Sequence, residues 1–122
     1  MDNPILRKPR FYFDVTARPS HVTFDDGQSE RQNFPWMHYV GARWSYADPN
    51  AIRVLIGDFL VLITGHNLAP LFCAIEEHTL IRVRARPDLA HYREHDPDSF
   101  ATEVVFMPAQ PKKGQTEFDL AV

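Results

Sequence analysis

Residues 52–84 read IRVLIGDFLVLITGHNLAPLFCAIEEHTLIRVR and decide the fold. Two apolar runs rich in β-branched residues, 52–56 and 59–63, flank Gly57 and Asp58, a pair that suits the positive φ angles of a two-residue hairpin turn. The residue pairs that this turn sets opposite one another are Ile56 with Phe59, Val54 with Val61, and Ile52 with Ile63. Apolar residues occupy both faces of the predicted hairpin, so other parts of the chain must cover both.

An amphipathic helix is predicted directly after the hairpin, over residues 67–77. The apolar side chains that recur at the i, i+3, i+4, i+7 spacing of one helical face are Leu68, Leu71, Phe72 and Ile75. Asn67 is suited to cap the N-terminus of this helix. We expect the helix to lie on the sheet, and Phe72→Ala to cost on the order of 3–5 kcal/mol because it opens a cavity between them.

Alternating apolar and polar residues predict further strands on both sides of this stretch. The expected segments are 10–16, 21–24, 29–34, 37–46, 80–85 and 100–106. In the first of them, Phe11, Phe13 and Val15 are expected to face the core, and His38 is expected to be a core histidine. The sequence therefore predicts an α+β domain, a mainly antiparallel β-sheet of about seven strands curled into a roll or partial barrel, with one amphipathic α-helix packed on it.

Length and composition predict a single domain, because 122 residues with 44% hydrophobic content fill one core. We divide the chain into a disordered N-terminal end (1–8), a globular α+β domain (9–107) and a flexible C-terminal tail (108–122). In the tail, Phe118, Leu120 and Val122 recur at a strand period. This pattern would let the tail add an edge strand to a neighbour or to its own sheet.

Charge and cysteine usage narrow the classes of function. The 13 lysines and arginines against 16 aspartates and glutamates give a net charge of -3, the wrong sign for binding nucleic acid through bulk charge. Cys73 is the only cysteine, so no intramolecular disulfide and no cysteine-rich zinc site can form. No apolar run reaches the roughly 18 residues of a membrane helix. We expect a cytoplasmic protein that has no membrane contact and no cofactor.

The segment from His91 to His95 matches the H-x-x-E-H pattern of inverted zinc peptidases. On a helix, His91 and His95 share a face and could bind one metal ion, while Glu94 polarises a water molecule. Such an enzyme needs a third ligand from a second helix, and little of the chain follows His95. A metal-dependent hydrolase is therefore an alternative, and a solvated polar loop is the preferred interpretation.

His66 and Asn67 precede the predicted helix, where backbone N–H groups and the helix dipole favour an anion. They are candidate anion ligands, although the segment lacks the repeated glycines of a phosphate loop and helix capping is the preferred interpretation. The sequence contains no G-x-S-x-G elbow and no nucleophile with a base at recognisable spacing. We assign no catalytic residue and do not expect an enzyme.

Arg82, Arg84 and Arg86 recur at a strand period and are predicted to line one side of their strand. Together with some of the nine Phe, four Tyr and two Trp, they could stack on and clamp single-stranded RNA or DNA. Most of these aromatic residues alternate with polar ones, as residues facing a core do. Nucleic-acid binding is therefore an alternative interpretation and not the leading one.

The leading interpretation is a non-enzymatic interaction or accessory domain that self-associates or binds a protein partner. One helix covers one face of the hairpin, so the other face must close against the remaining strands or against another copy of the chain. The candidate interface residues are Phe34, Trp36 and Met37, which lie at a break in the strand pattern. We therefore expect a homo-oligomer or a complex with a protein partner.

Overall fold

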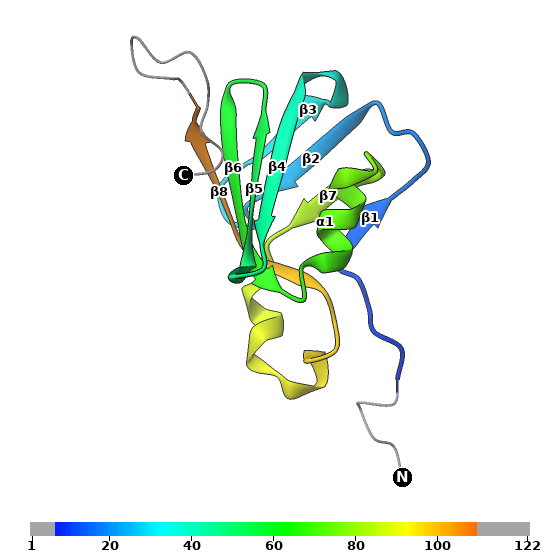
Figure 1. The fold of residues 1–122 in the computed structure, drawn as a ribbon. Helices are drawn as coiled ribbons and strands as arrows, with labels where there is room; N and C mark the ends of the chain where they lie inside the picture. The colour runs from blue at the N-terminus through cyan, green and yellow to red at the C-terminus, as the bar shows by residue number, and fades with distance from the viewer. Residues whose placement is uncertain (1–6, 110–122) are drawn as a thin grey trace.

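Eight β-strands in two sheets and one α-helix make up residues 7–109, the part of the chain that this computed structural model describes (Figure 1). The strands are β1 (Phe13–Val15), β2 (His21–Asp25), β3 (Arg31–Pro35), β4 (Tyr39–Ser45), β5 (Asp48–Ile56), β6 (Phe59–His66), β7 (Leu80–Arg84) and β8 (Phe100–Pro108). The α-helix is α1 (Ala69–Glu76), and the 3-10 helices are η2 (Trp36–His38), η3 (Pro87–His91) and η4 (Arg93–His95).

The strand order is β1-β7-β2-β3 in the first sheet and β4-β5-β6-β8 in the second. Among the strand pairs within residues 7–109, only β2 and β7 run parallel. The prediction of an α+β domain with a mainly antiparallel sheet is confirmed, with eight strands instead of about seven. Strand β3 lies at one end of the first sheet.

The central hairpin, β5 and β6, has the predicted register. Ile56 pairs with Phe59, Val54 with Val61, and Ile52 with Ile63. Gly57 occupies the turn with φ +58°, the left-handed conformation that glycine adopts without strain. The side chains of Ile52, Val54, Val61 and Ile63 are fully buried, which makes this hairpin the centre of the core.

Helix α1 is shorter than predicted and begins differently. Asn67 has φ +50°, so it lies in a left-handed turn before the helix, and Leu68 occupies the N-cap position without a side-chain hydrogen bond. The predicted cap is therefore wrong. Leu71 and Ile75 are buried as expected, but the Phe72 ring is half-buried and packs against Trp44, with ring centroids 5.7 Å apart.

The two sheets meet in two places. On one side, α1 contacts both β4 of the second sheet and β7 of the first (Figure 1). On another, Ala85 follows β7 and forms a parallel bridge with Ala101 of β8, and the Arg86 amide donates to the Ala101 carbonyl oxygen at 2.7 Å. Apolar side chains from both sheets fill the space between them.

Two of the three predicted interface residues are not at the surface. Phe34 and Trp36 are 7% and 6% exposed and belong to the core cluster, and the Trp36 indole donates to the Leu80 carbonyl oxygen at 3.1 Å. The expectation that they form an exposed patch is wrong, because η2 turns Trp36 inward between the sheets. Met37, the third residue, is 85% exposed.

Several predicted core positions also face solvent. Val40, an apolar residue of the predicted strand 37–46, is 65% exposed because the register of β4 shifts between Tyr39 and Gly41. His38 is exposed and is not a core histidine. In the first strand, Phe13 packs on the core, while Phe11 and Val15 are more than half exposed. Strand irregularities that sequence alternation cannot show account for these differences.

The predicted disordered end (1–8) and flexible tail (108–122) fall mostly outside the described residues. Of these positions, the structure describes Arg7, Lys8, Pro108 and Ala109. Pro108 ends β8, and the Ala109 amide donates to the Asp58 carbonyl oxygen at 2.9 Å. Within residues 7–109, no helix is long and apolar enough to cross a membrane.

Leu71→Ala is expected to lower the free energy of unfolding by about 2–5 kcal/mol, because the Leu71 side chain is 1% exposed and leaves a cavity. Phe72→Ala is expected to cost less, roughly 1–2 kcal/mol, since its ring is only half-buried. Urea unfolding followed by tryptophan fluorescence measures both. Cys73→Ala, at an exposed position of the same helix, is the control, and an equal loss in all three variants would contradict the packing described for α1.

Candidate functional site

The predicted arginine stripe lies in a groove on the first sheet. The groove has a volume of about 280 Å³ and is lined by Phe11, Tyr12, Phe13, Asp14, Arg82, Arg84 and Arg86, which we call the arginine groove. Strand β1 pairs antiparallel with β7, with Phe13 opposite Val83 and Asp14 opposite Arg82. Because side chains alternate along a strand, Val83 is buried in the core while Arg82 and Arg84 are exposed on the groove side.

Aromatic rings form part of the groove wall. Phe11 is 55% exposed and its ring is stacked on that of Phe13, with centroids 5.6 Å apart and planes 7° from parallel. The Arg86 guanidinium lies over the Tyr12 ring at 5.8 Å from its centroid, within the range of a cation–π interaction. Sequence alternation assigned Phe11 to the core, whereas in the structure Phe11 is more than half exposed and belongs to the groove lining.

The groove carries positive charge although the whole chain is acidic. Arg86 forms an ion pair with Asp88 at 3.0 Å, and this hydrogen-bonded partner raises the pKa of Arg86. The guanidinium groups of Arg82 and Arg84 make no hydrogen bond or ion pair with the rest of residues 7–109. Asp14 is the acidic residue of the lining. Within the described part of the chain, these two arginines are thus available to bind an anion.

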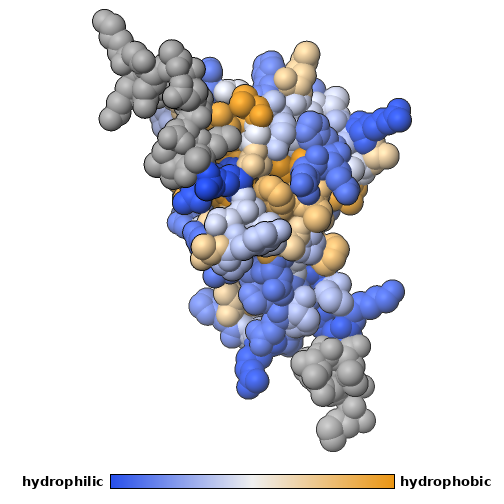
Figure 2. Space-filling view, in the orientation of Figure 1, coloured by the Kyte–Doolittle hydropathy of each residue, from blue (hydrophilic) through white to orange (hydrophobic). Residues whose placement is uncertain are grey.

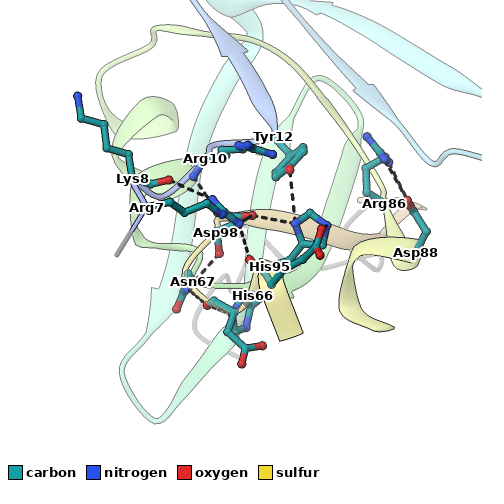
Figure 3. Close-up of polar contacts among 12 residues, drawn as sticks. Arg7, Lys8, Arg10, Tyr12, His66, Asn67, Arg86, Asp88, His95 and Asp98 are labelled. Carbon is teal, nitrogen blue, oxygen red and sulfur yellow. Dashed lines mark hydrogen bonds and ion pairs between the residues drawn. The ribbon is translucent and has the colours of Figure 1, made fainter. Parts of the chain in front are cut away.

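The buried carboxylate of Asp98 and its side-chain partners Arg7 and His95, which we call the Asp98 anchor, hold the segment that supplies the aromatic residues. The Asp98 side chain is fully buried and accepts hydrogen bonds from both Nη atoms of Arg7 at 2.8 Å, from the Arg10 amide at 2.9 Å and from His95 Nδ1 at 2.9 Å (Figure 3). The Arg7 guanidinium is the largest of the influences that hold the pKa of Asp98 well below its usual range. Asp98 is therefore ionised at neutral pH.

Backbone contacts continue from Asp98 to the groove. The Ser99 amide donates to the Arg10 carbonyl oxygen and the Tyr12 amide donates to the Ser99 carbonyl oxygen, both at 2.9 Å. The Tyr12 hydroxyl also lies 3.5 Å from His95 Nδ1. Figure 3 shows Tyr12 between the Asp98 anchor and Arg86. Residues 7–15, which we call the N-terminal arm, are thereby fixed beside β7, and Tyr12 belongs to both the anchor and the groove.

The candidate anion ligands His66 and Asn67 are engaged with a loop. His66 Nε2 lies 2.6 Å from the Asp96 carbonyl oxygen, and the Asn67 side-chain amide donates to the carbonyl oxygens of Asp96 and Asp98, each at 3.0 Å. These contacts connect the end of β6 to residues 96–98 and so support the Asp98 anchor. His66 and His95 also line a second hollow of about 330 Å³, together with Phe100.

The predicted metal ligands His91 and His95 do not share a helical face. Tyr92, between them, has extended backbone angles and separates η3 from η4. His91 is exposed, whereas His95 is 9% exposed and has its Nδ1 directed at Asp98. Residues 7–109 contain no group of three or more His, Cys, Asp or Glu side chains arranged to hold a metal ion. The helical premise of the zinc hypothesis is wrong.

The hydropathy of the surface differs between the middle of the molecule and the end that carries η3 and η4. Figure 2 shows apolar side chains gathered near the middle of the viewed face, while the end that carries η3 and η4 is mostly hydrophilic. The Asp98 anchor is therefore a buried ionic cluster beneath a polar surface. A cluster of this kind stabilises the fold only while its charged partners remain paired.

Asp98→Asn is expected to lower the free energy of unfolding at pH 7 by about 1–3 kcal/mol, because it weakens charge-assisted hydrogen bonds to Arg7 and the Arg10 amide. The folded-state pKa of Asp98 is depressed, so this contribution is complete above about pH 5 and is lost as the pH falls below about 4. Urea unfolding at several pH values should show the wild type and the variant converging in acid.

Asp96→Asn is the matched control, because Asp96 is exposed and its carboxylate makes no hydrogen bond or ion pair within residues 7–109. A difference between wild type and Asp98→Asn that stays constant from pH 7 to pH 3 would show that the carboxylate charge is not what holds the arm.

Comparison with protein-family models, with curated proteins and with solved structures gave no match to this chain.

Proposed function

We propose that this protein binds a short stretch of single-stranded nucleic acid in the arginine groove. The observation that carries the proposal is that Phe11, which is 55% exposed, lines one groove with Arg82 and Arg84, whose guanidinium groups make no hydrogen bond or ion pair within residues 7–109. Guanidinium groups contact phosphates, and an accessible ring stacks on a base. Unpaired strands offer bases that are free to stack, whereas bases inside a duplex do not.

The dimensions and charge of the groove favour a weak, local mode of binding. A volume of about 280 Å³ accommodates very few nucleotides, and a net charge of -3 opposes contact with a long polyanion elsewhere on the surface. Two phosphate contacts predict a slope of log K against log salt concentration of about -1.4, since each contact on a single strand contributes about -0.7.

A protein-interaction role is the second candidate. β4 is an edge strand of its sheet, and Met37 and Val40, which lie just before it and within it, are 85% and 65% exposed. An edge strand beside exposed apolar side chains favours pairing with a second copy of the chain or with a protein partner. Homo-oligomerisation, a cytoplasmic location and closure of the two sheets into a partial barrel all stay predictions.

The variant Arg82→Ala/Arg84→Ala is expected to bind a fluorescent eight-nucleotide oligo(dT) or oligo(U) at least ten-fold more weakly than the wild type. Its salt slope is expected to be smaller in magnitude by about 1.4. Fluorescence anisotropy in 20–200 mM salt measures both quantities.

Arg31→Ala/Arg93→Ala removes the same charge from two exposed positions outside the groove and is the control. Phe11→Ala should weaken binding without changing the salt slope, because a ring contributes stacking and no charge. Equal loss in the groove and control variants would reduce the effect to overall charge and would contradict the proposed site.

A further inference from the structure

The sequence after β8 contains carboxylate side chains, whose negative charge complements the arginines of the groove. Residues 115–122 read QTEFDLAV, in which Glu117 and Asp119 alternate with Phe118 and Leu120. In an extended conformation, successive side chains point to opposite sides, so the carboxylates form one face and the apolar side chains the other. These residues lie outside the part of the chain that the structure describes, and only their sequence enters the argument.

The groove offers a complementary surface for such a segment. Arg82 and Arg84 of β7 make no hydrogen bond or ion pair within residues 7–109, and the lining also contains Asp14 and the half-exposed Phe11. β1 lies at the edge of its sheet and has β7 as its only strand partner within residues 7–109. An edge strand accepts an added extended segment through backbone hydrogen bonds, while neighbouring side-chain sites supply specificity.

The length of the chain allows the segment to reach the groove of its own molecule. The distance to recover is about 23 Å, the length of β8 from Pro108 back to Ala101, which lies beside Arg86. Seven residues separate Ala109 from Glu117, and the eight Cα-to-Cα steps between these two residues span at most about 26–29 Å when extended. When extended, residues 117–122 span about 17 Å more. This length exceeds the roughly 13 Å of extended backbone between Arg86, which lies two residues beyond β7, and Arg82 within it.

We propose that residues 115–122 dock in the arginine groove of the same chain, with Glu117 and Asp119 on Arg84 and Arg82. The docked segment occupies the surface that a single strand of nucleic acid uses, so the chain limits its own affinity. This consequence rests on the proposed function, whereas the docking itself does not. A nucleic acid displaces the segment when its phosphates compete successfully for the two arginines.

The first test measures the docking without nucleic acid, in the full-length variant Glu117→Gln/Asp119→Asn, whose own segment has lost its charge. A fluorescein-labelled peptide of residues 114–122 is titrated with this variant, and a saturable rise in anisotropy is expected. The added substitution Arg82→Ala/Arg84→Ala should abolish the rise. An absence of binding, or binding that survives loss of both arginines, overturns the proposal.

The second test measures oligonucleotide affinity in the full-length chain. Glu117→Gln/Asp119→Asn should bind the eight-nucleotide oligo about five-fold or more tightly than Asp48→Asn/Glu103→Gln, which removes the same charge from two exposed positions outside the groove. Equal affinities overturn the self-limiting role. If the peptide binds and no variant binds the oligo, the docking stands and the proposed function fails. If the oligo binds and the peptide does not, the reverse holds.

Discussion

The buried carboxylate of Asp98 is the interaction on which the functional surface depends. It lies at the start of the segment leading into β8, yet its hydrogen-bond partners include Arg7 and the Arg10 amide, near the other end of the chain. An ionised group without solvent is costly unless its partners are complete, so the N-terminal arm cannot leave without exposing an unpaired charge. Asp98 thus fixes an arm whose only regular strand, β1, has three residues.

The arm in turn completes the groove. β7 supplies the arginines by simple alternation, but a row of arginines on an exposed strand is an ordinary solvated surface. Once the arm lies beside β7, Phe11 and Tyr12 form a wall next to these charges, and Tyr12 connects the wall to the anchor through His95. Charge from one segment and aromatic surface from another then converge, which is the combination that single-strand binding needs.

Local features of this fold could be predicted from sequence, and long-range features could not. The register of the central hairpin and the exposure of Arg82 and Arg84 follow from a two-residue turn and from strand alternation. Asp98 gave no signal, because an isolated aspartate in a polar loop shows nothing of a partner 91 positions away. The predictions for Phe11 and Trp36 were wrong for the same reason. The exposure of these two side chains depends on where the arm and η2 lie in the folded chain, and the alternation of a strand does not encode that position.

Native-state amide hydrogen exchange, comparing the wild type with Asp98→Asn, tests most directly whether this carboxylate holds the arm. The Tyr12 amide donates to Ser99 and the Thr16 amide donates to Thr79, so both report on the arm. We expect the substitution to lower protection at these amides, while the amides of Val54 and Val61 in the central hairpin keep their protection. Unchanged protection at Tyr12, or an equal loss throughout the core, would contradict it.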